Sequence, residues 1–186
     1  MSIPQKKYPT IACCGLDCGL CPRYYTEGAS RCPGCAGPGF SDKHPSCSFI
    51  TCCVKKKKLE ACGECPEFPC PKFKTGEEYR QVPLSSSYPP YRNLMPNQEF
   101  IRDHGISAFL IGQARRTGLL ETMLRGFDEG RSRSAFCRAA ALLDIDRLEK
   151  ALEEASGTNA GDRKTRANLL KDILAGHLAA QDSQNP

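Results

Sequence analysis

The stretch that decides the fold runs from Cys13 to Cys70: CCGLDCGLCPRYYTEGASRCPGCAGPGFSDKHPSCSFITCCVKKKKLEACGECPEFPC. Twelve of the thirteen cysteines of the chain lie in it. Three pairs have the C-x-x-C spacing, which turns two thiolates toward one point: Cys18/Cys21, Cys32/Cys35 and Cys62/Cys65. Few apolar residues accompany them, so folding here depends on cross-links or bound metal. The pattern predicts a small, metal-stabilised loop module.

Disulfides are the alternative to metal. The first residues, MSIPQKKYPTIACC, contain no apolar signal-peptide segment, so we expect a cytoplasmic protein whose thiols stay reduced. In that setting C-x-x-C spacing favours metal binding, and the odd number of cysteines agrees. No apolar run has the length of a membrane span, so we expect no membrane association.

Adjacent cysteines limit the number of ligands, because the two side chains of a vicinal pair project differently. Cys13/Cys14 and Cys52/Cys53 should supply one ligand each, with the choice between Cys52 and Cys53 left open. Ten ligands are then predicted, which is two more than two four-thiolate sites require. They are Cys14, Cys18, Cys21, Cys32, Cys35, Cys47, Cys52, Cys62, Cys65 and Cys70. His44, which precedes a proline, is expected to be an exposed loop residue instead.

The metal is not decided by the ligand type, because zinc and iron–sulfur clusters both accept four thiolates. Paired knuckles with nearby glycine favour Zn²⁺. A [4Fe-4S] cluster is the alternative, supported by the triad Cys14, Cys18 and Cys21 and by the distant Cys70-Pro71. Radical S-adenosylmethionine enzymes use the same triad spacing, but the helical sequence downstream does not fit their barrels.

The formal charge of +5 lies wholly in the cysteine-rich part. Residues 1–75 carry 11 Lys/Arg against 6 Asp/Glu, and the remainder carries 15 of each. Each four-thiolate zinc site has a net charge of about −2, so two such sites nearly cancel the surplus. With no tryptophan and no aromatic residue within the run Lys55–Lys58, binding to nucleic acid is not expected.

We expect a fold in which the cysteine-rich module precedes a mainly α-helical bundle. The boundaries are 1–75 for the module, 76–96 for a linker, 97–181 for the helical domain and 182–186 for a frayed tail. Apolar residues repeat at helical spacing throughout the third range. We also expect a short strand over 8–12, helical turns over 54–61, an N-cap at Asn97, a helix end at Gly105 and a cap at Asp162.

Nothing in the sequence looks like an activated nucleophile with its base, which favours a non-enzymatic protein. Cys137 is interpreted as a small buried helix residue. The first hypothesis is a metal-binding protein with two four-cysteine zinc sites that acts as an adaptor for a protein partner. The alternatives are an iron–sulfur redox accessory protein and a zinc-thiolate group-transfer protein.

Three cysteine motifs resemble one family closely: Cys14-Gly-Leu-Asp-Cys18-x-x-Cys21-Pro, Cys32-x-Gly-Cys35 and Cys62-x-x-Cys65-Pro-Glu-Phe-Pro-Cys70. The family is the cysteine-rich domain of unknown function 3795 (DUF3795). Residues 100–106 and 130–137 look like its longer members, in which helices follow the cysteine module. The resemblance implies metal binding and an intracellular setting but supplies no reaction. Cys47, Cys52 and Cys53 depart from the usual register of the family.

Overall fold

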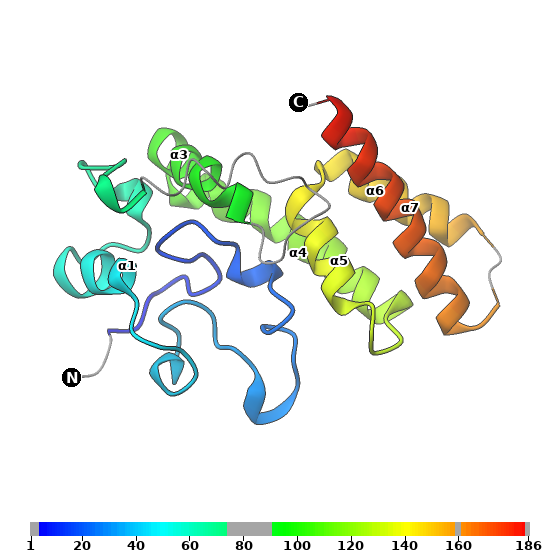
Figure 1. The fold of residues 1–186 in the computed structure, drawn as a ribbon, viewed down its shortest axis with the longest axis horizontal. Coiled ribbons are helices and arrows are strands. Elements are labelled where there is room, and N and C mark those ends of the chain that lie inside the picture. Colours follow the sequence, from blue (N-terminus) through cyan, green and yellow to red (C-terminus); the bar gives the residue numbers. More distant parts are fainter. Residues whose placement is uncertain (1–3, 74–90, 159–160, 185–186) are drawn as a thin grey trace.

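A computed structural model describes residues 4–73, 91–158 and 161–184. The cysteine-rich module lies at one end of the molecule and the helical bundle at the other (Figure 1). The predicted class, a cysteine-rich part followed by helices, agrees with this arrangement. The expected linker falls mostly on residues 74–90, outside the described residues.

Short turns, with one longer helix, build the module. Three-residue 3₁₀ turns cover Cys18–Leu20, Gly28–Ser30, Phe40–Asp42, Cys62–Glu64 and Pro71–Phe73. Helix α1, Ser48–Ile50, continues directly into a π-helical segment, Thr51–Lys56. The prediction of helical turns over 54–61 was therefore wrong in its start and its end. The expected strand over 8–12 was also wrong: within the described ranges the backbone forms one isolated bridge, between Ile11 and Asp17.

Among the described residues, the helical part contains five α-helices after a 3₁₀ turn at Tyr91–Asn93. They are α3 (Leu94–His104), α4 (Ile106–Phe127), α5 (Arg133–Leu142), α6 (Ile145–Gly157) and α7 (Arg163–Gln184). None of the described helices combines the length and the apolar character that a membrane span requires. The helix α7 includes residues 182–184, which we expected in a frayed tail.

Helix ends follow the local sequence closely. Gly105 separates α3 from α4 with φ of 84°, a conformation that glycine adopts without strain. The Asp162 carboxylate accepts a hydrogen bond of 2.7 Å from the Thr165 amide, which confirms the predicted cap. The N-terminus of α3 differs from the prediction, because the helix begins at Leu94 and not after Asn97.

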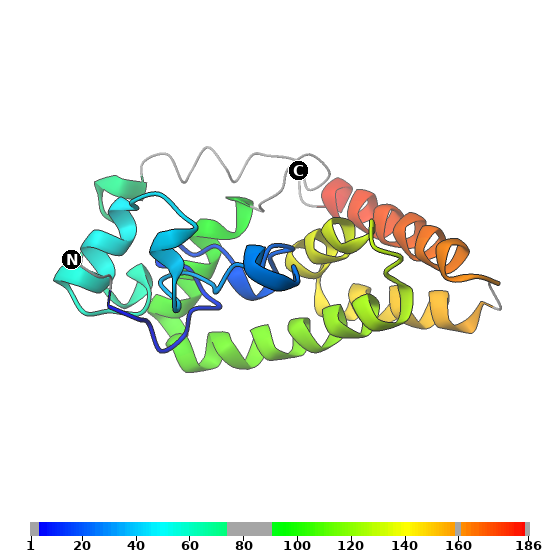
Figure 2. The ribbon, with the colours of Figure 1, turned by 90° about the horizontal axis from the view of Figure 1, so that it is seen from below.

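Helix α4 connects the two ends of the molecule. Figure 2 shows it running below the module and on beneath the other helices. Its first half contacts the module and its second half packs against α5, α6 and α7. The bundle core is apolar and includes Leu120, Met123, Phe136, Leu148 and Leu170, all fully buried or nearly so. One module residue, Leu20, inserts into this core, so the two parts share buried surface.

A buried polar contact also joins the module to the helical part. Gln113 of α4 donates hydrogen bonds to the Thr10 carbonyl (3.0 Å) and to the Asp17 carboxylate. Burial raises the pKa of Asp17 to about 6, while Gln113 and the Arg116 guanidinium oppose the shift. Asp17 is thus largely ionised at neutral pH, beside a positive charge from the helical part.

Candidate metal centre

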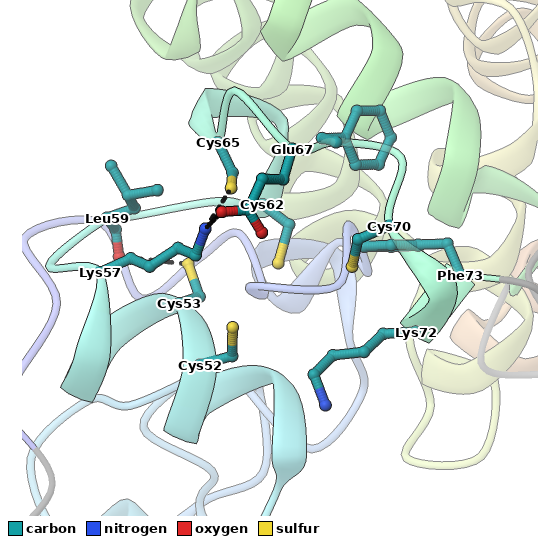
Figure 3. Close-up of a pocket in the computed structure, with 11 residues that line it drawn as sticks. Cys52, Cys53, Lys57, Leu59, Cys62, Cys65, Glu67, Cys70, Lys72 and Phe73 are labelled. Atoms are coloured by element: carbon teal, nitrogen blue, oxygen red, sulfur yellow. Dashed lines mark hydrogen bonds and ion pairs between the residues drawn. The ribbon is translucent and has the colours of Figure 1, made fainter.

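Five thiols line one enclosed cavity in the module. Figure 3 shows Cys52 from the π-helical segment facing Cys62, Cys65 and Cys70, with Cys53 beside them. The cavity has a volume of about 30 Å³, and Lys57, Glu67 and Lys72 line it together with Leu59, Phe68 and Phe73. One water needs ~10–15 Å³ by the same measure, so there is room for a single ion or two waters.

The knuckle Cys62-Gly-Glu-Cys65 is fixed by local hydrogen bonds. The Cys65 amide donates to the Cys62 carbonyl at 3.0 Å, which closes the turn. The Glu64 carboxylate accepts from the amides of Glu60 and Ala61, both at 2.9 Å. This negative side chain therefore binds backbone donors rather than facing the sulfurs. The turn keeps Cys62 and Cys65 on the same side of the loop.

A lysine lies against this group of thiols. Lys57 Nζ is 3.2 Å from Cys65 Sγ and 2.6 Å from the Glu67 carboxylate. Contact with Glu67, and then with Cys65, raises the pKa of Lys57 above its usual value. The ammonium group stays charged, so a thiolate at Cys65 would have a cation within hydrogen-bonding distance. The run Lys55–Lys58 thus includes one residue that contacts the cavity.

Cys52 and Cys53 differ in burial and in direction. Cys53 is 2% exposed, and its Sγ donates to the Leu59 carbonyl at 3.3 Å. Cys52 is less buried and points toward Cys62 and Cys70 in Figure 3. Both lie within the π-helical segment Thr51–Lys56.

A second group of cysteines packs around Cys35. Its Sγ is 3.9 Å from Cys13 Sγ. Cys14, Cys18 and Cys47 pack against the same buried cluster. Burial, together with the neighbouring Cys35 and Cys47 thiols, raises the pKa of Cys14 to about 12. Burial also raises the pKa of Cys18 well above its usual value.

These raised pKa values have a clear meaning for metal binding. Without metal the buried thiols are neutral, because several thiolates so close together would repel one another in a poorly solvated site. A divalent cation reverses this preference, since it binds thiolates and releases their protons. In the described part of the chain, no three His, Cys, Asp or Glu side chains are arranged to hold a metal ion. The neutral thiols lie in clusters, but among the described residues no three of them converge on a common point.

His44 lies beside Cys32, which the sequence did not lead us to expect. Its Nε2 is 3.2 Å from Cys32 Sγ, and its ring stacks on Phe40 with centroids 4.4 Å apart. Burial, and the charges of Arg23 and Lys43, lower the pKa of His44. The sequence contained one relevant signal, a histidine between Cys35 and Cys47, but its position before Pro45 argued the other way. Cys32 and His44 form a pair of potential ligands away from the cavity.

Cys137 is fully buried in the bundle core, which confirms its interpretation as a small core residue. Burial raises its pKa to about 12, and the neighbouring Cys21 thiol adds to the shift. A neutral, inaccessible thiol is a poor nucleophile. Cys21 itself is partly exposed at the edge of the module.

Helix α3 braces the cysteine loops from the helical side. Gln98 is fully buried; its Oε1 accepts from the Gly63 amide and its Nε2 donates to the Cys13 carbonyl at 3.2 Å. Asn97 Nδ2 donates to the Gly15 carbonyl at 2.8 Å. A Cβ at Gly63 would lie 2.4 Å from the Gln98 carbonyl oxygen. The helix and the loops are thus in close contact through backbone atoms.

Comparison with known proteins identifies one matching family model. Neither the curated proteins nor the solved structures contain a match to it. The motifs over 100–106 and 130–137 lie outside the matched region. The resemblance predicted from the cysteine motifs is confirmed: residues 10–75, the cysteine-rich part of this chain, match the family described as protein of unknown function (DUF3795).

Proposed function

We propose that this chain is a non-enzymatic metal-binding protein whose cysteine-rich module holds two zinc ions through four cysteines each. The observation that carries the proposal is the cavity lined by five thiols. Soft sulfur ligands select zinc, copper(I) or iron–sulfur clusters over magnesium or calcium. The first site comprises Cys52, Cys62, Cys65 and Cys70.

The second site comprises Cys14, Cys18, Cys35 and Cys47. These four thiols belong to one buried cluster. Cys35 and Cys47 lie close enough to Cys14 to raise the pKa of its thiol. Of the ten cysteines predicted as ligands, Cys21 and Cys32 then remain. Cys13 and Cys53 stay as buried neutral neighbours of the two sites, with Cys53 bonded to a backbone carbonyl.

Two features favour zinc over a four-iron cluster at the first site. The cavity of about 30 Å³ suits an ion, whereas a cluster with its own sulfides would need the walls to move apart. The Lys57 ammonium offsets part of the net charge of about −2 that four thiolates and Zn²⁺ carry. Zinc here stabilises the fold, since the module has little apolar core of its own.

Elemental analysis of protein purified without oxygen tests the proposal. We expect about two zinc per chain and no visible colour. Cys65→Ser and Cys47→Ser should each reduce the content to about one, because each removes one of four ligands from a different site. Cys137→Ser is the matched control and should retain the wild-type content, since its thiol lies in the bundle core.

Three results would reject the proposal. Iron with acid-labile sulfide and absorbance near ~400 nm would assign the thiols to an iron–sulfur cluster and favour the redox role. Loss of all zinc from both single variants, with the circular dichroism of the helices unchanged, would show one shared site instead of two. A metal-free, well-folded chain would also contradict it.

A further inference from the structure

A second hollow, well separated from the thiol cavity, opens where α3, α4 and the junction of α5 with α6 meet. Its volume is about 410 Å³, within the ~300–1,000 Å³ typical of small-molecule sites. Such sites are common where structural units join. The lining includes Asp17 from the module, Phe100 from α3 and Arg116 from α4, but no cysteine. We call it the α3–α4 groove.

The wall formed by α4 is lined by small residues. Ala108 and Gly112 are one helical turn apart and both line the groove. A Cβ at Gly112 would meet no heavy atom within 4 Å, so the absent side chain leaves open space. Glycine in a helix interior costs ~1 kcal/mol relative to alanine. Packing therefore does not require glycine at this position.

The opposite wall is aromatic. Phe100 lines the groove and is 42% exposed, which is unusual for a phenylalanine in this fold. Its ring meets Phe109 edge-on, with centroids 6.3 Å apart. Between the aromatic wall and the small residues of α4, the groove offers apolar surface to a flat or aliphatic group.

Charge decides the class of ligand. Asp17 is 9% exposed, and one of its carboxylate oxygens accepts a hydrogen bond from Gln113. Arg116 Nη1 donates to the carbonyls of Ala140 (2.9 Å) and Leu143 (2.5 Å), which directs that nitrogen to the backbone. Asp144 also lines the groove. Two carboxylates against one guanidinium leave it negative.

We propose that the α3–α4 groove binds a small organic cation. The cationic nitrogen pairs with the Asp17 carboxylate, and the apolar part lies over Ala108 and Gly112 beside the Phe100 ring. An aromatic face attracts cations in addition to its apolar contacts. The groove shares no lining residue with the thiol cavity, although Asp17 directly precedes Cys18 of the second thiol site.

Calorimetric titration with three probes of one shape tests the charge assignment. Benzylamine should bind, and benzyl alcohol and benzoate should bind at least about tenfold more weakly, a difference of ~1.4 kcal/mol. Equal affinity for the three probes, tighter binding of benzoate, or no binding of benzylamine would overturn the proposal. Zinc-loaded protein is used throughout, and its zinc content is measured before each titration.

Matched glycine variants locate the site. Gly112→Leu fills the groove and should abolish benzylamine binding, whereas Gly118→Leu, in equally open space on the same helix but outside the groove, should leave it unchanged. Asp17→Asn keeps the shape and should weaken benzylamine about tenfold with little effect on benzyl alcohol. Unchanged binding by Gly112→Leu would place the ligand elsewhere and reject the groove.

Discussion

Lys57 shows how a single residue in a charged run can differ from its neighbours. The run Lys55–Lys58 has the sequence of a solvated loop, and Lys56 and Lys58 are indeed exposed. Lys57 instead reaches Cys65 and Glu67. The sequence does not distinguish these lysines, because the distinction depends on the direction of each side chain at the end of the π-helical segment.

Replacing Lys57 tests its role beside the thiolates. Lys57→Met keeps the aliphatic length but removes the cation, so we expect zinc affinity to fall about tenfold, at the lower end of effects from residues surrounding a metal site. Competition with a chromophoric chelator measures the change. Lys56→Met removes the same charge from an exposed position and should leave the affinity almost unaltered. Equal losses in both variants would mean that only the overall charge matters.

Gly63 is a second residue whose role only the fold reveals. Gly63→Ala places a Cβ 2.4 Å from a backbone oxygen of α3, so either the knuckle or the helix must move. We expect the free energy of unfolding to fall by ~1–3 kcal/mol, as for other overpacked sites. Urea denaturation of the zinc-loaded protein measures this. Gly118→Ala, in open space on α4, should instead raise stability by up to about 1 kcal/mol. A neutral Gly63→Ala would show that the loop and helix separate easily.

At the scale of elements, α3 belongs to the cysteine-rich module as much as to the bundle. The side chain of its Gln98 bonds both to the Gly63 amide, between Cys62 and Cys65, and to the Cys13 carbonyl. Its Asn97 holds the loop at Gly15. The expected domain boundaries place this helix with the bundle after a linker. The hydrogen bonds instead suggest that the loops and α3 order together.

A pair of buried glutamines provides the test of this coupling. Gln98→Met should lower zinc affinity at least about tenfold, because the knuckle loses its bond to α3. Gln181 is also buried, in α7, and bridges the Asp144 amide and the Leu142 carbonyl in the same manner, far from the thiols. Gln181→Met should destabilise the bundle and leave zinc affinity unchanged. If both variants lose zinc alike, the effect of Gln98 is on stability alone.

At the scale of the whole molecule, the two ends have different sources of stability. The core cluster of the bundle consists almost entirely of helical apolar residues, with Leu20 as the module residue inside it. The module packs thiols with Ala12, Ala36, Ile50 and Val54. Hydrophobic burial therefore stabilises the bundle, and under the proposed function zinc adds to the stability of the module.

Metal removal should separate these contributions. After treatment with a strong chelator under reducing conditions, we expect amide hydrogen exchange to increase across residues 10–73 and in α3, while α5, α6 and α7 remain protected. Helical circular dichroism should fall only slightly. Uniform loss of protection would show that the bundle also needs the metal. Unchanged exchange in the module would contradict a stabilising role for zinc.

Local sequence alone was enough to predict the composition of the module and the order of the elements. C-x-x-C spacing, the helix end at Gly105 and the Asp162 cap are features set by neighbours within about four residues, and the structure agrees on each helix end. Helical periodicity identified the bundle because apolar residues repeat at helical spacing within each segment. The family match over 10–75 rests on the same local motifs.

Which distant residues meet depends on tertiary packing and could not be predicted from the sequence. Cys32 and His44, Cys13 and Gln98, and Asp17 and Gln113 are brought together by packing of separate segments, and nothing in the spacing between them requires it. The direction of Cys52 and Cys53 likewise follows from where α1 and its π-helical continuation lie, a helix that began earlier than the sequence indicated. The α3–α4 groove arises in the same way, because its walls come from separate segments that share no local pattern.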